Sequence, residues 1–359
     1  MGLTDPCMPR MPVQSRNFVL ACYAVSLIQG ESILAKHIRS KTVKLYIKAA
    51  KALFRQRQLP TTPTLDTDYI KVIIHTHERY ENVPKRRNMI SDGMMHWLKK
   101  NQAKHDQDDA LPAVVDWLVL GRYTGHRKSE WCNDSQSKYE KIDHWPGQPA
   151  LAFIHSDFTF LDKYERTAEV TLTTNPTDIH YVNIQWRKQK NGDNGAEITF
   201  GSDYKNPPFC PVQAAVSIVQ RSLRLGNPHD EPLAVFKNKK GKRKFISSSM
   251  VETHLRKAAS TVHNIPPKDP YLKQWSTHSI RVTAANLLHR ERFSDSFIQK
   301  RLRWKSTSFL DYLRNTIYAA DQHAGLKLSP ANLPPMEERT YREDEPHDYI
   351  LNAIAAAAA

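Results

Sequence analysis

The most regular pattern along the chain is a helical repeat of apolar positions in residues 42–54. Apolar side chains recur there every three or four residues and so fall on one face of a helix. They are Val43, Tyr46, Ile47, Ala50 and Phe54. Thr42 directly precedes them and is a suitable N-cap. The pattern is typical of a helix that packs into a small helical core.

Changes in composition predict how the chain is divided. Residues 1–16 hold three prolines and predict a flexible lead-in, whereas the helical pattern extends over residues 17–105. The polar, acidic stretch 106–110 predicts a linker to a larger second domain over residues 111–325. The remainder, 326–359, contains prolines, an acidic stretch and five terminal alanines, and we expect it to be a tail.

The second domain mixes two hydrophobic periods. An apolar helix is expected over residues 111–120, and helical patterns return after Pro211. Between them, Val182, Ile184 and Trp186 alternate with polar residues, as in a half-buried strand. A glycine-containing turn follows, which predicts a β-hairpin. The sequence therefore predicts a mostly α fold with a small β-hairpin or sheet.

Charge and cysteine usage narrow the class of partner. The net charge of +15 indicates a polyanion, with nucleic acid as the first candidate and a merely soluble basic protein as the alternative. The cysteines are far apart, so neither a zinc site nor a disulfide framework is expected, which fits an intracellular location. The longest apolar run, 18–28, is too short to span a bilayer, so no membrane partner is expected.

Two clusters of cations are candidates for contact with DNA. Along the helix at 42–55, one face carries four cations, which repel one another and favour an anionic partner, although a solvated face is the alternative. These are Lys44, Lys48, Lys51 and Arg55. A second cluster precedes the next expected helix and consists of Lys85, Arg86 and Arg87.

Two segments of the second domain combine residues that suit phosphate chemistry. In residues 123–131, a Thr-Gly turn after the apolar helix presents Arg127, and Glu130 can brace it from three residues away. In the helix expected over residues 276–290, His278 and Arg281 lie side by side. A proton carrier beside a permanent cation is a useful pair around a phosphate.

A third segment, residues 298–318, offers a nucleophile. Its apolar positions predict a helix whose buried stripe contains Phe309, Leu310, Leu313 and Ile317. Tyr312 lies well off that stripe and is available for chemistry. Tyr318 is also off the stripe, so helical geometry does not choose between the two tyrosines.

Taken in order, these segments resemble the tyrosine recombinases, the family of the phage integrases. Residues 124–130 read TGHRKSE, which matches the family's TGxRxSE, and residues 278–281 match its HxxR motif. The run IQKRLRWKS at 298–306 is similar to IQxxLGHxS, with Trp304 at the His/Trp position and Tyr312 at the nucleophile. The segments GHRKSEW and RWKSTSFLDYLRN resemble those of the recombinases in the Crypton group of eukaryotic mobile elements.

The hairpin lysine of the family has two candidates here. Lys190 directly precedes an Asn-Gly pair and fits best, whereas Lys188 points to the same face of the strand two residues earlier. The resemblance covers residues 111–325 and implies an α+β tyrosine-recombinase catalytic domain, preceded by a helical core-binding domain that clamps DNA.

The resemblance also implies a mechanism and partners. Tyr312 would form a 3′-phosphotyrosyl bond, Arg127 and Arg281 would clamp the phosphate, and Lys190 would protonate the leaving oxygen. His278 and Trp304 would assist. No metal ion, ATP or other cofactor is expected. The partners would be double-stranded DNA and a homo-tetramer assembled on it, to which residues 326–354 would contribute by docking on a neighbouring protomer.

Two other functions remain open from the sequence. One is a recombinase-derived protein that binds DNA without cutting it, and the other is a type IB topoisomerase, which rejoins the same strand. The expected location is intracellular, and nuclear if the host is eukaryotic. The target DNA sequence is not encoded in any recognisable motif.

Overall fold

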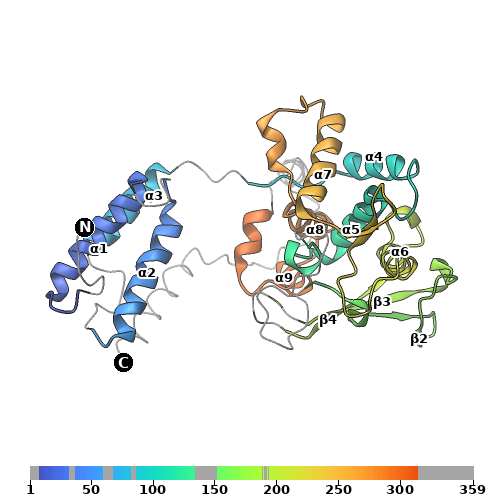
Figure 1. The fold of residues 1–359 in the computed structure, drawn as a ribbon, viewed down its shortest axis with the longest axis horizontal. Coiled ribbons are helices and arrows are strands. Elements are labelled where there is room, and N and C mark those ends of the chain that lie inside the picture. Colours follow the sequence, from blue (N-terminus) through green and yellow to red (C-terminus); the bar gives the residue numbers. More distant parts are fainter. Residues whose placement is uncertain are drawn as a thin grey trace, which may run out of the picture. The chain divides into compact units, whose positions relative to one another are not determined.

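The chain divides between Lys85 and Arg86 into two units, shown as ribbons in Figure 1. The structure is a computed structural model. It describes residues 8–31, 37–59, 68–81, 86–133, 152–187, 189, 192 and 194–313. Within those ranges, no helix is both long and apolar enough to cross a membrane.

The first unit contains the helices α1 (Val13–Gln29), α2 (Ser40–Gln56) and α3 (Asp68–Tyr80). Each helix packs against the other two. Val43 and Ile47 of α2 are fully buried in their shared core, as the apolar repeat predicted. The helices are stable because each buries one apolar face on its neighbours.

Two boundaries in this unit differ from the prediction. α1 already begins at Val13, and Met8 is buried against the same core, so the part of the expected lead-in that the structure describes, residues 8–16, is ordered. α2 begins at Ser40, so Thr42 lies inside the helix and is not its N-cap. Proline at the start of a helix is compatible with helical structure, which is why the proline-rich segment misled the prediction.

The second unit begins earlier than the sequence indicated. Helix α4 (Asp92–Gln102) packs against α5 (Ala110–Thr124) and α7 (Ser248–Val262), so it belongs to this unit. The linker expected at residues 106–110 therefore lies inside the second unit. A helical period shows which face of a helix is buried, but it does not show which helix covers that face.

Helix α5 lies at the centre of the second unit. Its sequence is apolar almost all round, and it is covered by α6 (Pro211–Arg224) on one side and by α8 (Ser279–Arg290) on another. A helix of this composition is stable only when it is surrounded. Helix α9 (Asp295–Arg301) follows and packs on α8.

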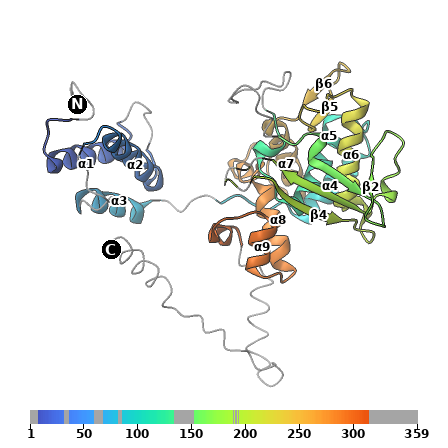
Figure 2. The same ribbon diagram turned by 90° about the horizontal axis from the view of Figure 1, so that it is seen from below.

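An antiparallel sheet lies against α6 (Figure 2). Its strand order is β2-β1-β3-β4, from β1 (Phe158–Leu161), β2 (Thr167–Ala168), β3 (Tyr181–Trp186) and β4 (Ala196–Gly201). The sequence prediction did not include β1 and β2. Both strands are short, and such lengths give too few alternations to be recognised.

The predicted β-hairpin is confirmed as β3 and β4. Val182 pairs with Phe200 and Ile184 with Ile198. Val182, Ile184 and Trp186 are buried, as their alternation with polar residues predicted. The fold is therefore mostly helical with a small antiparallel sheet, in agreement with the fold class expected from the sequence.

The remaining elements are short. A second hairpin is formed by β5 (Val235–Lys237) and β6 (Arg243–Phe245). Its turn, residues 238–242, contains three lysines. Several 3-10 turns connect the longer elements. They are η1 (Lys128–Glu130), η2 (His155–Asp157), η3 (Pro176–Asp178), η4 (Pro207–Phe209), η5 (Pro270–Gln274) and η6 (Thr307–Tyr312).

Candidate active site

The C-terminus of α5 turns sharply to present Arg127. Gly125 ends the helix with φ +53, a left-handed conformation that suits glycine. A Cβ at this position would lie 3.1 Å from Leu302 and 3.3 Å from Ala284, so the turn also needs glycine for space. His126 is fully buried, and Arg127 follows at the start of η1.

Glu130 holds Arg127 in place, as the sequence predicted. Its Oε1 accepts a hydrogen bond from Arg127 Nη1 at 2.9 Å, and its Oε2 accepts one from the Arg127 backbone N–H at 2.8 Å. Trp186 Nε1 donates to the same Oε2 at 3.1 Å. Glu130 is 4% exposed, so Arg127 is fixed by charge-assisted hydrogen bonds to a buried residue.

Arg281 comes from α8 and is also fixed from several sides. Its Nη1 donates to the Gly125 carbonyl at 2.7 Å, and its guanidinium lies 4.3 Å from the centre of the Trp304 ring. The helix end at Gly125 carries negative partial charge on its carbonyl groups, which attracts a cation. Stacking on Trp304 adds a cation–π contact.

His278 precedes the first turn of α8 beside Arg281. Burial, together with the positive charges of Arg281 and Arg87, lowers the pKa of His278 from 6.5 to about 4. The imidazole is therefore neutral at pH 7 and has a lone pair that accepts a proton. An anion placed against these arginines would raise the pKa again.

These side chains meet at a cavity of about 430 Å³. Its lining consists of His126, Arg127, Lys128, Ser129, Thr277, His278, Arg281 and Trp304. The structure thus brings together Arg127, His278, Arg281 and Trp304, which the sequence had assigned to one site although they lie far apart in the chain.

The expected nucleophile and the hairpin lysine are described only in part. Tyr312 is the last residue of η6, a 3-10 turn where the sequence predicted the middle of a helix, and its side chain lies outside the described part of the structure. Phe309 is buried as predicted, but Leu310 is 44% exposed, because the tighter turn rotates it away from the core. Lys188, Lys190 and Tyr318 lie outside the described residues.

The predicted DNA-contacting cations do not form one exposed stripe. Lys51 is 3% exposed and belongs to the buried side of α2, because it lies one helical turn from both Ile47 and Phe54. Lys44 is paired with Glu78 at 3.0 Å. Lys48 and Arg55 are exposed, as expected.

The second basic cluster is also divided. Arg86 and Arg87 are exposed, and Arg87 donates a hydrogen bond to the backbone carbonyl of Lys273. Lys85 lies outside the described residues. Arg86 and Arg87 therefore stay candidates for contact with a polyanion.

Two residues at the site were missed by the sequence analysis. His126 is fully buried, and burial lowers its pKa from 6.5 to about 3, with Arg303 and Arg281 contributing. Arg303 is 3% exposed and has φ +57. The one signal for Arg303 was its place in IQKRLRWKS, where the similar family pattern has glycine, the residue that most readily adopts such a φ.

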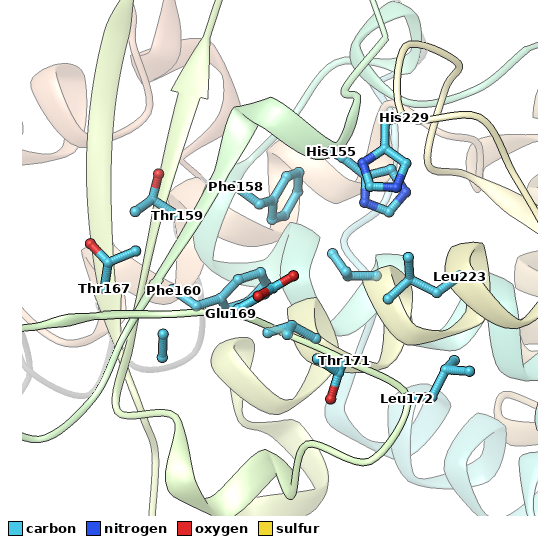
Figure 3. A pocket seen from close by; sticks show the side chains of 13 residues that line it. His155, Phe158, Thr159, Phe160, Thr167, Glu169, Thr171, Leu172, Leu223 and His229 are labelled. Atoms are coloured by element: carbon cyan, nitrogen blue, oxygen red, sulfur yellow. The ribbon is translucent and has the colours of Figure 1, made fainter.

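A second hollow, of about 590 Å³, lies between the sheet and α6 (Figure 3). Its walls are largely apolar, with Phe158 and Phe160 on one side and Leu223 on another. His155 stacks on His229 at its edge, with ring centres 4.4 Å apart. None of the predicted catalytic side chains that the structure describes lines this hollow, so the smaller cavity at Arg127 is the candidate active site.

Metal-binding side chains do not gather in the described part of the chain. Among those residues, no group of at least three His, Cys, Asp or Glu could hold a metal ion. The polar groups that line the candidate active site are mainly cationic or neutral donors. Its chemistry therefore suits an anion.

No model of a known protein family matches the chain, and no curated protein matches it significantly. Among solved structures, the chain is similar to the XerH site-specific recombinase bound to a palindromic difH substrate, at 14% identity and a TM-score of 0.47, over 88% of this chain and 72% of that one. It is also similar to the Tn1549 transposon integrase in complex with transposon right end DNA, at 14% identity and a TM-score of 0.49, over 89% and 88%. A lambda integrase dimer bound to a COC' core site matches at 16% identity and a TM-score of 0.42, over 88% and 83%.

Proposed function

We propose that this chain is a tyrosine-type DNA strand transferase, a site-specific recombinase or integrase that cuts and rejoins DNA through a 3′-phosphotyrosyl intermediate. The observation that supports this most is the cavity at which Arg127, His278, Arg281 and Trp304 meet. The turn that ends at Tyr312 packs on α8, the helix that carries Arg281. A protein that only binds DNA has no need of two rigidly held arginines and a neutral histidine around one small cavity.

Arg127 and Arg281 would bind the two non-bridging oxygens of the scissile phosphate. Negative charge grows on these oxygens as a nucleophile adds to phosphorus, so fixed guanidiniums stabilise the transition state more than the ground state. Both arginines are held by hydrogen bonds, Arg127 to Glu130 and Arg281 to the Gly125 carbonyl. They therefore require little reorganisation when DNA arrives.

His278 would move a proton during the reaction. Its lowered pKa keeps the imidazole neutral before DNA binds, so it is able to accept a proton from the attacking tyrosine. The bound phosphate would bring its pKa towards neutrality. Trp304 would keep Arg281 in place by stacking and offer its indole N–H to the phosphate.

The covalent step would be a balanced transesterification. The Tyr312 oxygen attacks phosphorus and loses its proton to a base, for which His278 is the candidate. The bond from phosphorus to the 5′-oxygen breaks, and Lys190 gives that oxygen its proton. One phosphoester replaces another, so the energy of the bond is retained and no ATP is needed.

Strand exchange sets further expectations for partners. Two duplexes contain four strands to be cut, which fits a homo-tetramer with one protomer for each strand. The first unit would clamp double-stranded DNA, with Lys48 and Arg55 as phosphate contacts. The similarity of GHRKSEW to the Crypton group favours integration or excision of a mobile element, with action in the nucleus of a eukaryotic host. The segment 326–354 would dock on a neighbouring protomer.

A covalent capture experiment tests this function. The chain is incubated with a pool of nicked suicide duplexes whose sequence around the nick is randomised, so that cleavage releases a short strand and cannot reverse. The expected result is a protein–DNA adduct that survives SDS with the wild type and is lost in Tyr312→Phe. An adduct that persists in Tyr312→Phe contradicts the choice of nucleophile.

The same materials separate the two rival functions. DNA that binds the wild type without any adduct favours a recombinase-derived DNA-binding protein. An adduct together with relaxation of supercoiled plasmid, but without joining to a second duplex, favours a type IB topoisomerase. Joining to a partner duplex supports recombination.

A further inference from the structure

Arg303 lies directly before Trp304, and its side chain turns into the interior behind the candidate active site. It is 3% exposed. Its Nη2 lies 3.3 Å from Glu130 Oε2, and its Nη1 donates to the Thr124 carbonyl at 3.1 Å. One guanidinium thus binds both the end of α5 and the carboxylate that holds Arg127.

The same guanidinium also contacts the β3–β4 hairpin. Its centre lies 3.6 Å from the centre of the Trp186 ring, and its Nε donates to Gln189 Oε1 at 3.2 Å. Gln189 is 8% exposed and lies in the sequence between Lys188 and Lys190, the two candidates for the hairpin lysine. Arg303 therefore connects the loop of Arg127, the hairpin and the segment of Trp304.

The backbone of Arg303 has φ +57, which is unfavourable for a residue with a Cβ. This backbone conformation lets two neighbouring side chains point in different directions. Trp304 lines the cavity, whereas Arg303 points to Glu130. A conformation that glycine would adopt more easily is kept here by a side chain with five donors. The contacts of the guanidinium outweigh the local strain.

Charge gives a second reason for an arginine at this place. Glu130 alone would neutralise Arg127 and weaken its attraction for a phosphate. Arg303 is also paired to Glu130, so its positive charge offsets part of the negative charge that faces Arg127. Arg281 adds another positive charge at the same cavity. Because Glu130 and Arg303 are buried, solvent screens their charges little, and these charges act strongly on an anion in the cavity.

We propose that Arg303 is a positioning residue of the site, which holds Arg127 and the hairpin in register through Glu130 and Gln189 and offsets the charge of Glu130. This inference rests on the proposed function, because it concerns the cleavage step. Arg303 itself does not line the cavity and would not touch the phosphate.

Three substitutions and a matched control test the role. Arg303→Met removes the charge and keeps the volume, Arg303→Lys keeps the charge, and Arg303→Gly accepts the left-handed φ without strain. The control is Arg221→Met. Arg221 is another buried arginine of the same unit, paired with Asp116, and it does not line the cavity.

Cleavage is measured as single-turnover adduct formation with saturating suicide DNA, at a temperature at which all variants are folded by circular dichroism. We expect Arg303→Met and Arg303→Gly to lower the rate constant by about 100-fold, the typical effect of a small misplacement of a catalytic group. DNA affinity should change little, and Arg221→Met should cleave like the wild type. Arg303→Lys should recover part of the rate.

Guanidinium rescue distinguishes positioning from stability. Guanidinium chloride at a concentration below that which unfolds the protein should raise the rate of Arg303→Gly, which leaves a guanidinium-sized space, and not that of the wild type. Arg303→Met cleaving at the wild-type rate, or equal losses in Arg303→Met and Arg221→Met, would overturn the inference. Absence of any wild-type adduct is a different outcome, because it overturns the proposed function itself.

Discussion

The buried carboxylate of Glu130 is the structural anchor of the site, and Glu130→Gln is the sharpest perturbation of it. The carboxylate accepts hydrogen bonds from the backbone and side chain of Arg127, from Trp186 and from Arg303, at 2.8 to 3.3 Å. A glutamine keeps the shape of the side chain. It loses the negative charge, however, and presents an NH₂ group to donors.

The expected cost follows from burial. Glu130 and Arg303 are 4% and 3% exposed, so the substitution breaks a buried ion pair from one side. Breaking a buried ion pair from one side costs about 3–5 kcal/mol. We therefore expect the free energy of unfolding to fall by about that amount, together with a loss of cleavage because Arg127 is no longer held.

Urea unfolding followed by circular dichroism measures the effect. The matched control is Glu252→Gln, which removes a carboxylate from a half-exposed pair with Arg256 on α7, and about 0.5 kcal/mol is expected there. If Glu130→Gln unfolds within about 1 kcal/mol of the wild type, the carboxylate is not compensating two arginines and the reasoning fails.

Three further predictions follow from burial, charge and backbone conformation. His126 has a pKa near 3 in the folded chain and near 6.5 when unfolded, so stability present above pH 6.5 should fall by about 1.4 kcal/mol per pH unit towards pH 3. Urea unfolding at several pH values should show that the free energy of unfolding of His126→Gln depends less steeply on pH. An unchanged pH dependence would contradict a buried neutral imidazole. In DNA-binding titrations, the slope of log K against log salt concentration should become less steep by about 1 for Lys48→Ala and for Arg55→Ala, and should not change for the buried Lys51→Ala. A change in Lys51→Ala alone would refute the assignment. Gly125→Ala should destabilise by about 1–3 kcal/mol more than Gly226→Ala in thermal unfolding, because both have positive φ but only Gly125 is crowded; equal losses would remove the packing argument.

Much of the site could be predicted because its residues carry local signals. Alternation of Val182, Ile184 and Trp186 predicted the hairpin, and a glycine turn predicted where Arg127 would be presented. Each signal comes from a few neighbouring positions, and the structure contains both the hairpin and the turn at Gly125. That Arg127 and Arg281 line one cavity was expected from the order of the motifs.

Other features depend on contacts between distant parts of the chain. The spacing of Lys51 from Lys48 and Arg55 indicated a charged face, but Lys51 also lies one turn from Ile47 and Phe54. The packing of α2 against its neighbours decides that Lys51 is buried. The packing of α4 on α5 and α7 has no signature in the sequence of α4. Arg303 and Glu130 form an ion pair although they are far apart in the sequence, and no local pattern predicts such a pair.

The identity of the nucleophile is the central claim, and mass spectrometry of the adduct tests it directly. After capture on suicide DNA, nuclease trimming and trypsin digestion, the candidate tyrosines fall into separate peptides. Residues 306–314 contain Tyr312, and residues 315–327 contain Tyr318. The account predicts a nucleotide attached to the peptide of Tyr312. A nucleotide on the peptide of Tyr318, or on neither peptide, contradicts it.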